Sequence, residues 1–539
     1  MDRRQLLAGA AVGGAGLLLP ARLRAAKAPL AGFTHGVASG EPGQTEMLFW
    51  TRFAGTGRQA VPLKLEIATD PRMARARVMA EVEADPARDW TARTTIRGLA
   101  PGRTYYYRFL GPSKSSSAIG RTRTLPEGTP AAWRMGVFSC SNLPYGWFNG
   151  YGHAAAADDI DLFVHLGDYI YEYARGTYPD ARSAIPGRLI EPAGETVRRE
   201  DYWARYRSYR ADPDLQALHA SVAVVASWDD HEIANDAWRG GAENHSSSQG
   251  DWHARLAAAK AAYRDWMPVS DAAYARYDIG RLATLYRLDT RVEGRDPQLD
   301  LPAAIKRGPD TMTALKRLRD EEWVAGSRQL LGVSQEQWLF GELQAAGKRG
   351  VRWQVLAQQV VMGRLMVPPG ASQLAGPQPS AQVAAAMGAA ELAAKVGLPL
   401  NFDAWDGYPA ARARLLSAAQ RSGADLVVLA GDSHNAWASD LINDGRPAGV
   451  EFAGHSVSSP GFETYLAAPP SAVAGALVQA NPTLKWADTS NRGYMQLTLT
   501  PAEAVCEWRF TAPVSSRSNR LVAVVRGRAG AGQRRLVMG

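Results

Sequence analysis

The chain has 539 residues, 46% hydrophobic and 21% charged, a composition typical of a globular protein large enough for two or more domains. Its formal net charge of +8 suits anionic substrates, but the absence of a long Lys/Arg run gives little support for nucleic-acid binding. Only two cysteines are present, Cys140 and Cys506, which excludes a disulfide framework. No run of about 18 to 20 apolar residues follows the N-terminal region, so no internal membrane span is predicted.

Residues 1–26 are predicted to be an export signal. The segment has a basic start, then the apolar stretch LLAGAAVGGAGLLLP, then small residues at Ala25-Ala26. Arg3-Arg4 followed by Leu6-Leu7 resembles the twin-arginine signature, although Asp2 stands where Ser or Thr is common. An ordinary secretory signal is the alternative. With either signal, we expect the mature protein to be periplasmic or secreted.

Residues 30–127 are predicted to form a small β-sandwich domain. Short β-type runs such as EMLFWTRF, LKLEIATD and TYYYRFL are separated by Gly, Pro and Asp turn signals. The segment LAPGRTYYYRF, from Leu99 to Phe109, resembles the fibronectin type III pattern, in which Tyr105 would form a tyrosine corner. We expect this domain to position or shield the one that follows.

From Trp133 onward, strand-like runs alternate with helix-like runs, which predicts an α/β catalytic domain over residues 131–512. The expected helices include Phe148–Asp158, residues 198–220, Asp251–Trp266 and Ala410–Arg421. The run ATLYRLDTR, from Ala283 to Arg291, is expected to be a strand.

Three segments of this region are less regular. Ser334-Gln335-Glu336-Gln337 has the form of a capping box and predicts the start of a helix. Residues 368–400 are rich in Pro, Ala and Gly, and are expected to form a loop or a peripheral helical insertion. The basic, low-complexity residues 513–539 are expected to form a C-terminal tail.

Four of the apolar runs end in side chains that can bind a metal. These are RMGVFSCSN with Cys140 and Asn142, LFVHLGDYIYEY with Asp168 and Tyr171, VAVVASWDDHE with Asp229, Asp230 and His231, and LVVLAGDSHN with Asp432 and His434. Because ligands of open α/β sheets bind beyond the carboxyl ends of the strands, these four ends are expected to share one site.

The residue types favour particular metals. A thiolate from Cys140 and a phenolate from Tyr171 favour oxidised iron, because a trivalent ion lowers the pKa of both groups. Carboxylate and amide oxygens favour Ca²⁺, Mg²⁺ or Mn²⁺. Asp168 could bridge two ions, which would clamp a phosphoryl group and activate a water. Each residue alone also has a plainer interpretation: Cys140 as a buried thiol, Tyr171 as a packing side chain and His231 as a helix cap.

The ordered motifs FTHGVASGEP, VFSCSN, HLGDYIYEY, SWDDHEIANDAW, LDTR and AGDSHN resemble the alkaline phosphatase D (PhoD-like) family, a branch of the calcineurin-like metallophosphoesterases. The resemblance extends over roughly residues 33–510, and the motifs agree in kind, order and spacing. It implies a four-layer αββα catalytic sandwich preceded by the β-sandwich domain. It also implies an exported phosphomonoesterase and phosphodiesterase with iron and calcium as cofactors.

The resemblance also implies roles for individual residues. The positions that match the Fe³⁺ ligands are Cys140, Asp168, Tyr171 and His434, with Asp168 as the bridge. The positions that match the oxygen-rich second site, expected to hold one or two Ca²⁺, are Asp230 and Asp432. Asn235 and Asp236 lie where the family has further calcium or phosphate ligands, and the sequence does not distinguish between them. His231 matches the histidine that protonates or contacts the phosphoryl oxygens, and Arg291 is a candidate phosphate clamp.

Departures from the wider superfamily bear on the second metal. The opening Asp-x-His motif becomes Cys140-Ser141-Asn142, and Gly-His-x-His becomes Gly431-Asp432-Ser433-His434. A further histidine usually expected before the second motif is not visible, and RWQVLAQQ offers Gln358 and Gln359 instead. Because the second metal site lacks imidazole ligands, we expect it to hold calcium in preference to zinc, manganese or magnesium.

These features predict a metal-dependent phosphatase that hydrolyses phosphate monoesters, and diesters, through a metal-bound hydroxide or oxide, with protonation of the leaving group by His231 or a water. Two alternatives stay open: a family member that prefers diesters such as phospholipids or nucleic acids, and an exported phosphate- or metal-binding protein without catalysis. The expected partners are small phosphate esters and the twin-arginine export machinery. We expect a monomer with no specific nucleic-acid partner and no permanent membrane anchor.

Overall fold

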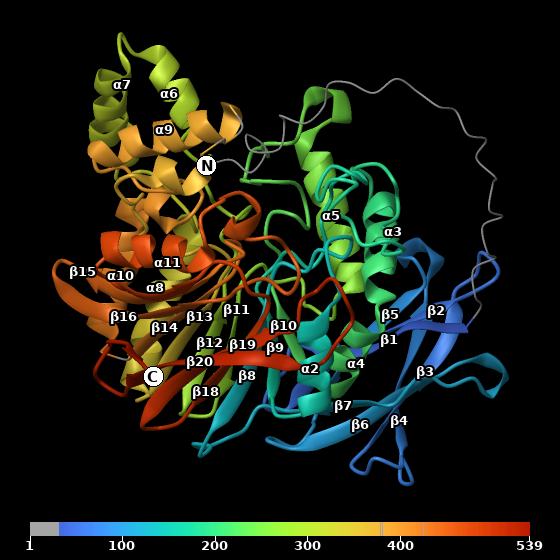
Figure 1. Cartoon of the computed structure of the whole chain (residues 1–539). Helices are drawn as coiled ribbons and strands as arrows, with labels where there is room; N and C mark the ends of the chain where they lie inside the picture. The colour runs from blue at the N-terminus through green and yellow to red at the C-terminus, as the bar shows by residue number, and fades with distance from the viewer. Residues whose placement is uncertain (1–31, 378, 380, 424) are drawn as a thin grey trace, which may run out of the picture.

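The computed structural model describes residues 32–377, 379, 381–423 and 425–539, so the predicted export signal lies outside the described residues. Two large β-sheets pack against each other at the centre of the molecule, and helices cover their outer faces (Figure 1). Among the described helices, none is both long and apolar enough to cross a lipid bilayer.

The first large sheet has ten strands in the order β21-β20-β19-β18-β8-β9-β10-β1-β2-β5. Their bounds are β1 Gly32–Gly40, β2 Glu46–Ala54, β5 Thr91–Arg97, β8 Trp133–Phe138, β9 Leu162–His165, β10 Val224–Ala226, β18 Gly493–Leu499, β19 Glu503–Thr511, β20 Leu521–Gly530 and β21 Val537–Met538. Strands β8, β9 and β10 are parallel neighbours, so their carboxyl ends lie at the same edge of the sheet.

The second large sheet has seven strands in the order β11-β12-β13-β14-β16-β15-β17. Their bounds are β11 Ala275–Ile279, β12 Ala283–Arg287, β13 Trp353–Ala357, β14 Asp425–Ala430, β15 Ala436–Asn443, β16 Arg446–Ala453 and β17 Leu484–Asp488. Strands β12, β13 and β14 are parallel, which brings their carboxyl ends together as in the first sheet.

One hydrophobic cluster fills the space between the two sheets. It includes Val164 and Leu497 from the first sheet, and Leu285, Val355 and Val427 from the second. The parallel strands are buried on both faces because helices cover their outer sides, which is why the sequence reads as continuous apolar runs instead of alternating ones.

Helices form the two outer layers. Those on the first sheet are α2 Asn149–Ala157, α3 Arg199–Arg210, α4 Pro213–Ser221 and α5 Trp252–Trp266. Those on the second are α8 Val333–Lys348 and α10 Pro409–Ser422. Further helices extend beyond these layers: α6 Leu301–Arg307, α7 Thr311–Arg317, the π-helical segment Leu318–Trp323, α9 Ala381–Lys395 and α11 Pro470–Ala480. The four-layer αββα arrangement is confirmed.

The N-terminal β-sandwich is also confirmed. Its outer sheet, in the order β4-β3-β6-β7, packs against β1, β2 and β5. Its strands are β3 Val61–Ala68, β4 Arg77–Ala84, β6 Thr104–Leu110 and β7 Gly120–Arg123. The Tyr105 hydroxyl accepts a hydrogen bond from the backbone N–H of Ala100 at 2.8 Å, as in a tyrosine corner. Strand β1 also pairs with β10 at Gly40 and Val224, so one sheet of the sandwich continues into the catalytic sheet.

The structure differs from the sequence prediction in three segments. Helix α8 begins at Val333, after Gly332 with φ 76°, and the first turn has no side-chain cap, so the capping box expected at Ser334 is wrong. Strand β12 ends at Arg287, which leaves Arg291 in the following loop. The expected tail instead contributes β20, whose run LVAVV pairs with β19, because these β-branched residues outweigh the neighbouring Arg and Gly. Residues 368–400 do contain a helical insertion, which includes α9.

Candidate metal centre

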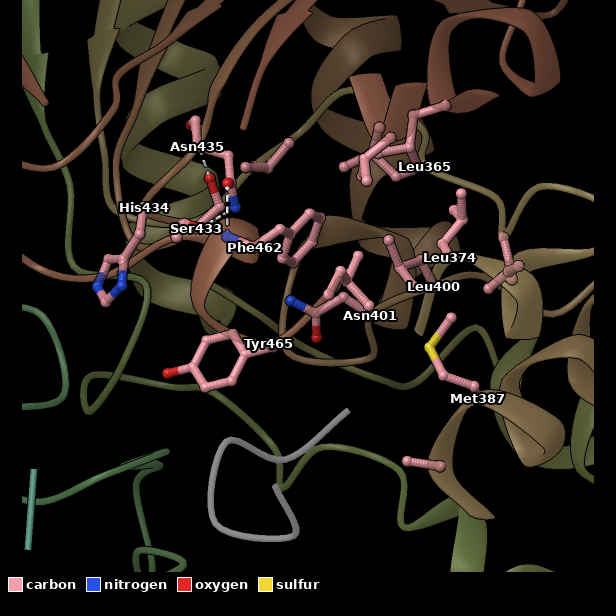
Figure 2. Close-up of a pocket in the computed structure, with 18 of the residues that line it drawn as sticks. Leu365, Leu374, Met387, Leu400, Asn401, Ser433, His434, Asn435, Phe462 and Tyr465 are labelled. Carbon is pink, nitrogen blue, oxygen red and sulfur yellow. Dashed lines mark hydrogen bonds between the residues drawn. The ribbon is translucent and has the colours of Figure 1, made fainter. Parts of the chain in front are cut away.

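The loops that follow β8, β9, β10 and β14 meet at the edge where the two sheets present their carboxyl ends. A cavity of about 180 Å³ opens beside this point, and His434, Ser433 and Asn435 lie at one end of it (Figure 2). The predicted convergence of strand ends therefore occurs, with contributions from both sheets.

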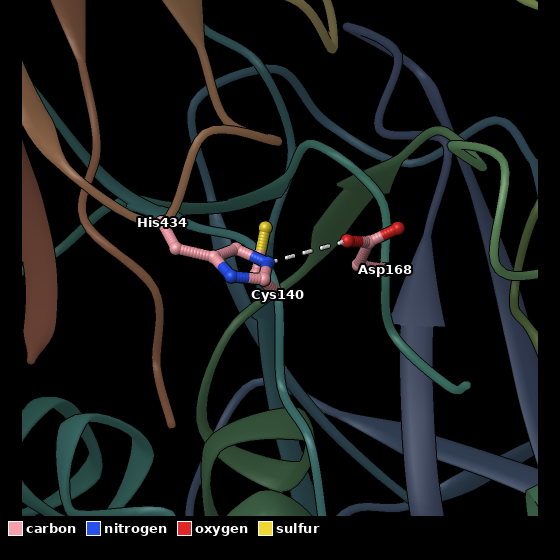
Figure 3. Close-up of side chains that lie close together, drawn as sticks. All are labelled: Cys140, Asp168 and His434. Atoms are coloured by element: carbon pink, nitrogen blue, oxygen red, sulfur yellow. Dashed lines mark ion pairs between the residues drawn. The ribbon is translucent and has the colours of Figure 1, made fainter. Parts of the chain in front are cut away.

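Three overlapping groups of buried side chains lie at this edge. They are Cys140, Asp168 and His434; Asp168, Asp230 and His231; and Asp229, Asp230 and Asp432. Within each group, one candidate ligand atom from every residue lies within 4.8 Å of the others. Because Asp168 belongs to two groups and Asp230 to two, the groups form a continuous row, which we call the ligand row. Figure 3 shows its first group, in which His434 Nε2 lies 3.9 Å from Asp168 Oδ2.

Four residues of the ligand row have a left-handed backbone, with φ of 59° at Cys140, 54° at Asp168, 58° at Asp432 and 60° at His434. This conformation is uncommon outside glycine and is often found at functional sites. Neighbouring Gly167 has φ 103°, and a Cβ there would come 2.3 Å from Cβ of Asp229. The loops after β9 and β10 are therefore in direct contact. The left-handed residues lie in the turns that bring their side chains into the ligand row.

Tyr171 lies at the first end of the ligand row. Its hydroxyl donates a hydrogen bond to Asp168 Oδ2 at 3.0 Å. The hydroxyl oxygen of Tyr171 also lies 3.1 Å from His434 Nε2 and 2.6 Å from the hydroxyl oxygen of Ser459. A phenol, an imidazole, a carboxylate and the Cys140 thiol are thus within reach of one ion.

His231 is fully buried and is oriented by a residue that the sequence analysis did not single out, Glu172. His231 Nδ1 lies 2.7 Å from Glu172 Oε2, and this contact fixes the orientation of the imidazole ring. Burial lowers the pKa of His231, but the carboxylates of Asp230, Glu172 and Asp168 outweigh burial and raise it to about 10. The clue in the sequence was the place of Glu172 within HLGDYIYEY.

Glu232 was also missed, and it joins two of the ligand loops. Its carboxylate accepts hydrogen bonds from the backbone N–H groups of Asp168 at 3.1 Å, Tyr169 at 2.6 Å and Asp229 at 2.8 Å. Burial raises the pKa of Glu232 to about 8, and the charge of Asp168 acts in the same direction. Glu232 therefore fixes the loop after β9 against the loop after β10.

Arg291 lies at the second end of the ligand row, fully buried. Its guanidinium donates to a carboxylate oxygen of Asp229, to Asp403 at 2.9 Å and to Asp432 at 3.0 Å. It also lies 3.5 Å from Asp230. The sequence proposed a phosphate clamp, whereas in the structure this side chain organises four carboxylates.

Asn235 and Asp236 are not members of the three groups that form the ligand row. Asn235 Oδ1 accepts a hydrogen bond from the Tyr173 hydroxyl at 2.8 Å. Asp236 Oδ2 accepts one from Gln298 at 2.6 Å, and its backbone N–H donates to Asp230 at 2.7 Å. Asp236 lies on the wall of the adjoining cavity and in none of the three groups.

Gln358 and Gln359, which stand where the wider superfamily has a histidine, make hydrogen bonds that stabilise the surrounding loops. The Gln359 amide oxygen accepts hydrogen bonds from the backbone N–H of Thr290 at 3.1 Å and from its hydroxyl at 2.5 Å. Gln358 donates to the backbone carbonyl of Val360 at 2.7 Å. Both side chains are directed at neighbouring polar groups that would otherwise be buried without partners.

The donors and charges of the ligand row fit two cations. The first end offers a thiol, a phenol and an imidazole, whereas the second end offers carboxylates. Burial holds the pKa of Asp229 well above its ordinary value despite the opposing charge of Arg291, and nearby Asp230 and Asp168 raise it further. Carboxylates crowded and buried in this way gain stability from a bound cation.

A four-layer fold with such a ligand row at its strand ends is that of a metallohydrolase. A model of the PhoD-like phosphatase family matches residues 135–508, and a model of the N-terminal domain of PhoD-like phosphatases matches residues 20–126. The chain belongs to the PhoD-like phosphatase family and is a phosphoric ester hydrolase.

Two similar proteins agree with this assignment. The chain is 31% identical to alkaline phosphatase D of Bacillus subtilis (strain 168) over 521 residues, which are 90% of this chain and 80% of the relative. A solved structure described as the structure of PhoD superposes with a TM-score of 0.77 at 28% identity. That match covers 95% of this chain and 93% of the other.

Proposed function

We propose that this chain hydrolyses phosphate monoesters, and diesters, at a mixed iron–calcium centre after export from the cytoplasm. The observation that carries the proposal is the ligand row, because its two ends offer different donors and are connected through the carboxylates of Asp168 and Asp230. Thiol and phenol donors suit a trivalent ion, and an oxygen-only set suits calcium.

The metal assignments follow the two ends. Fe³⁺ would be held by Cys140, Asp168, Tyr171 and His434. One or two Ca²⁺ would be held by Asp230 and Asp432, with Asp168 shared between the metals and Asn235 or Asp236 as candidate further ligands. When bound, these ions would polarise the phosphoryl oxygens and lower the pKa of water.

His231 is proposed to protonate the leaving alkoxide. Glu172 fixes the imidazole through Nδ1, so the proton for the leaving group would come from Nε2, on the other side of the ring. The nearby carboxylates of Asp168 and Asp230 favour the protonated ring. Arg291 holds Asp432 and Asp229 in place, and its role as a phosphate clamp stays a proposal that would require exchange of a carboxylate for phosphate.

The metal content of the purified protein, measured by mass spectrometry, tests this proposal together with aryl-phosphate hydrolysis before and after calcium chelation. We expect about one iron per chain, loss of hydrolysis on chelation and its return when calcium is added. Zinc or manganese in place of iron would leave a phosphoesterase but contradict the assignment of Cys140 and Tyr171. Hydrolysis that survives removal of both metals would contradict the whole mechanism.

Phosphodiester preference is a second candidate for the same centre, and matched aryl monoester and diester substrates distinguish it by their relative kcat/KM. The match to an enzyme over 90% of the chain favours catalysis over a binding-only protein. Export through the twin-arginine route is tested by replacing Arg3 and Arg4 with Lys together. Retention of the precursor in the cytoplasm supports that route, and unchanged export contradicts it.

A further inference from the structure

A cavity with mostly apolar walls adjoins the ligand row directly. Asp432, His434 and Asp236 line the same cavity of about 180 Å³ as a set of aliphatic side chains. In Figure 2, His434 lies at one end and Met387 at the other, with Phe462 and then Leu400 between them. The described residues that line this space include no Lys or Arg.

The walls of the cavity come from two separate hydrophobic clusters. One lies on the side of the second sheet and α11, and includes Leu365 and Leu477. The other lies on the helical insertion and includes Met387. Leu400 and Leu466 pack against both clusters, so the cavity is the space that the two clusters leave between them. Apolar walls facing such a space favour an apolar occupant over water.

We propose that this cavity binds the aliphatic chain of the substrate, so that the enzyme acts on phosphate esters of long-chain alcohols. The inference rests on the proposed function, because the phosphoryl group must lie at the ligand row for the chain to enter the cavity beside His434. The lining side chains offer no cation for a second phosphate, and most of them offer no partner for a sugar hydroxyl. At about 30 Å³ for each water-sized group, a volume of about 180 Å³ has room for roughly six of them.

A homologous series of n-alkyl phosphates, from ethyl to dodecyl and kept below micelle-forming concentrations, tests the proposal with the metal-loaded enzyme. Each methylene that enters the cavity should raise kcat/KM about fourfold, until the cavity is filled and the rise stops. A profile that does not change with chain length overturns the proposal, and so does a gain for aryl esters alone. In both cases, metal-dependent hydrolysis of the ethyl ester still supports the proposed function. If no member is hydrolysed, the proposed function fails as well.

Replacing Met387 locates the chain in this cavity. Met387→Gln keeps the length of the side chain but places an amide against the alkyl group, and Met387→Leu is the matched apolar control. We expect the ratio of kcat/KM for decyl phosphate to that for ethyl phosphate to fall about tenfold in Met387→Gln and to stay near the parent value in Met387→Leu. The ratio is independent of the fraction of active enzyme, so partial unfolding does not imitate the effect. An unchanged ratio in Met387→Gln overturns the placement of the chain.

Discussion

The two ends of the ligand row differ in donor chemistry and in charge. The first end combines a thiol, a phenol and an imidazole around Asp168, and hydrogen bonds connect Tyr171 to both Asp168 and His434. The second end is made of carboxylates, and the guanidinium of Arg291 already lies among them. One row of side chains can thus present two different environments, because the ends come from different loops and share only the central carboxylates.

This difference is the physical basis for the proposal that the two ends would hold different metals. A polarisable donor set stabilises a trivalent ion, whereas an oxygen-only set suits calcium. Arg291 lowers the net negative charge at the second end, which weakens the demand for a highly charged ion there. Variants at the shared centre and at each end test whether the two environments are independent.

Asp168→Asn should have the largest effect, because Asp168 belongs to two of the three groups and connects the first end of the row to Asp230. Loss of its charge is expected to reduce retention of both metals and to lower kcat/KM by about 10³-fold or more. Metal analysis and aryl-phosphate hydrolysis measure both consequences. Asp320→Asn, a change at an exposed carboxylate, is the control and should behave as the parent protein does. Near-parental activity in Asp168→Asn would contradict the bridging role.

Cys140→Ser should affect the first end selectively. A serine hydroxyl is a much poorer ligand than a thiolate, so we expect the iron content to fall while calcium is largely retained, and kcat/KM to fall about 10²-fold. The separate metal stoichiometries measure this selectivity. If calcium leaves together with iron, the two ends are not independent.

Asp432→Asn should give the reverse pattern. The change removes a charge from the second end, so calcium affinity is expected to fall while iron stays bound. We expect added calcium to restore part of the activity, with a kcat/KM loss of roughly tenfold to a hundredfold at limiting calcium. A calcium titration of the purified variant, followed by hydrolysis, measures the shift. Loss of iron in Asp432→Asn would show that His434 depends on the carboxylate two residues earlier.

Glu172→Gln should have the smallest effect of the four. The amide keeps a hydrogen bond to His231 but removes a negative charge, which lowers the pKa of His231 relative to the parent value. His231 must be protonated to donate its proton, so activity is lost as the pH rises through the pKa of His231. Because this pKa is lower in the variant, its activity should begin to fall at a lower pH than that of the parent protein. We expect a kcat loss of about tenfold near neutral pH with both metals retained. A parental pH profile would contradict this role.

The sequence predicts the position of the ligand row well because its residues lie at or just beyond the ends of apolar runs that the fold buries. Cys140, Asp168 and His434 could therefore be placed at one edge from the sequence alone. The ion pair between Arg291 and Asp403 could not be predicted, because Asp403 lies on a loop far along the chain from Arg291. Glu232 was equally hidden, since a glutamate that accepts three backbone N–H groups has no signature in sequence.

The fold itself was predicted at the level of layers and less well at its margins. The continuous apolar runs identified the buried strands, and LAPGRTYYYRF identified the corner at Tyr105. The C-terminal strand β20 was missed because alternating Arg and Gly dilute its β-branched residues. Its partner β19 supplies the missing information, and pairing between strands is a tertiary property.

Strand β8, which carries Cys140 at its end, has neighbours from opposite parts of the chain. Met135 pairs with Leu162 of β9 on one side and with Leu497 of β18 on the other. The central strand therefore gains its second neighbour only when almost the whole polypeptide has left the ribosome. Contacts between residues so distant in sequence form slowly. The sheet edge that carries the ligand row is therefore expected to form late in folding. A chain that lacks its last fifty residues would lack β18, and β8 would lose this neighbour.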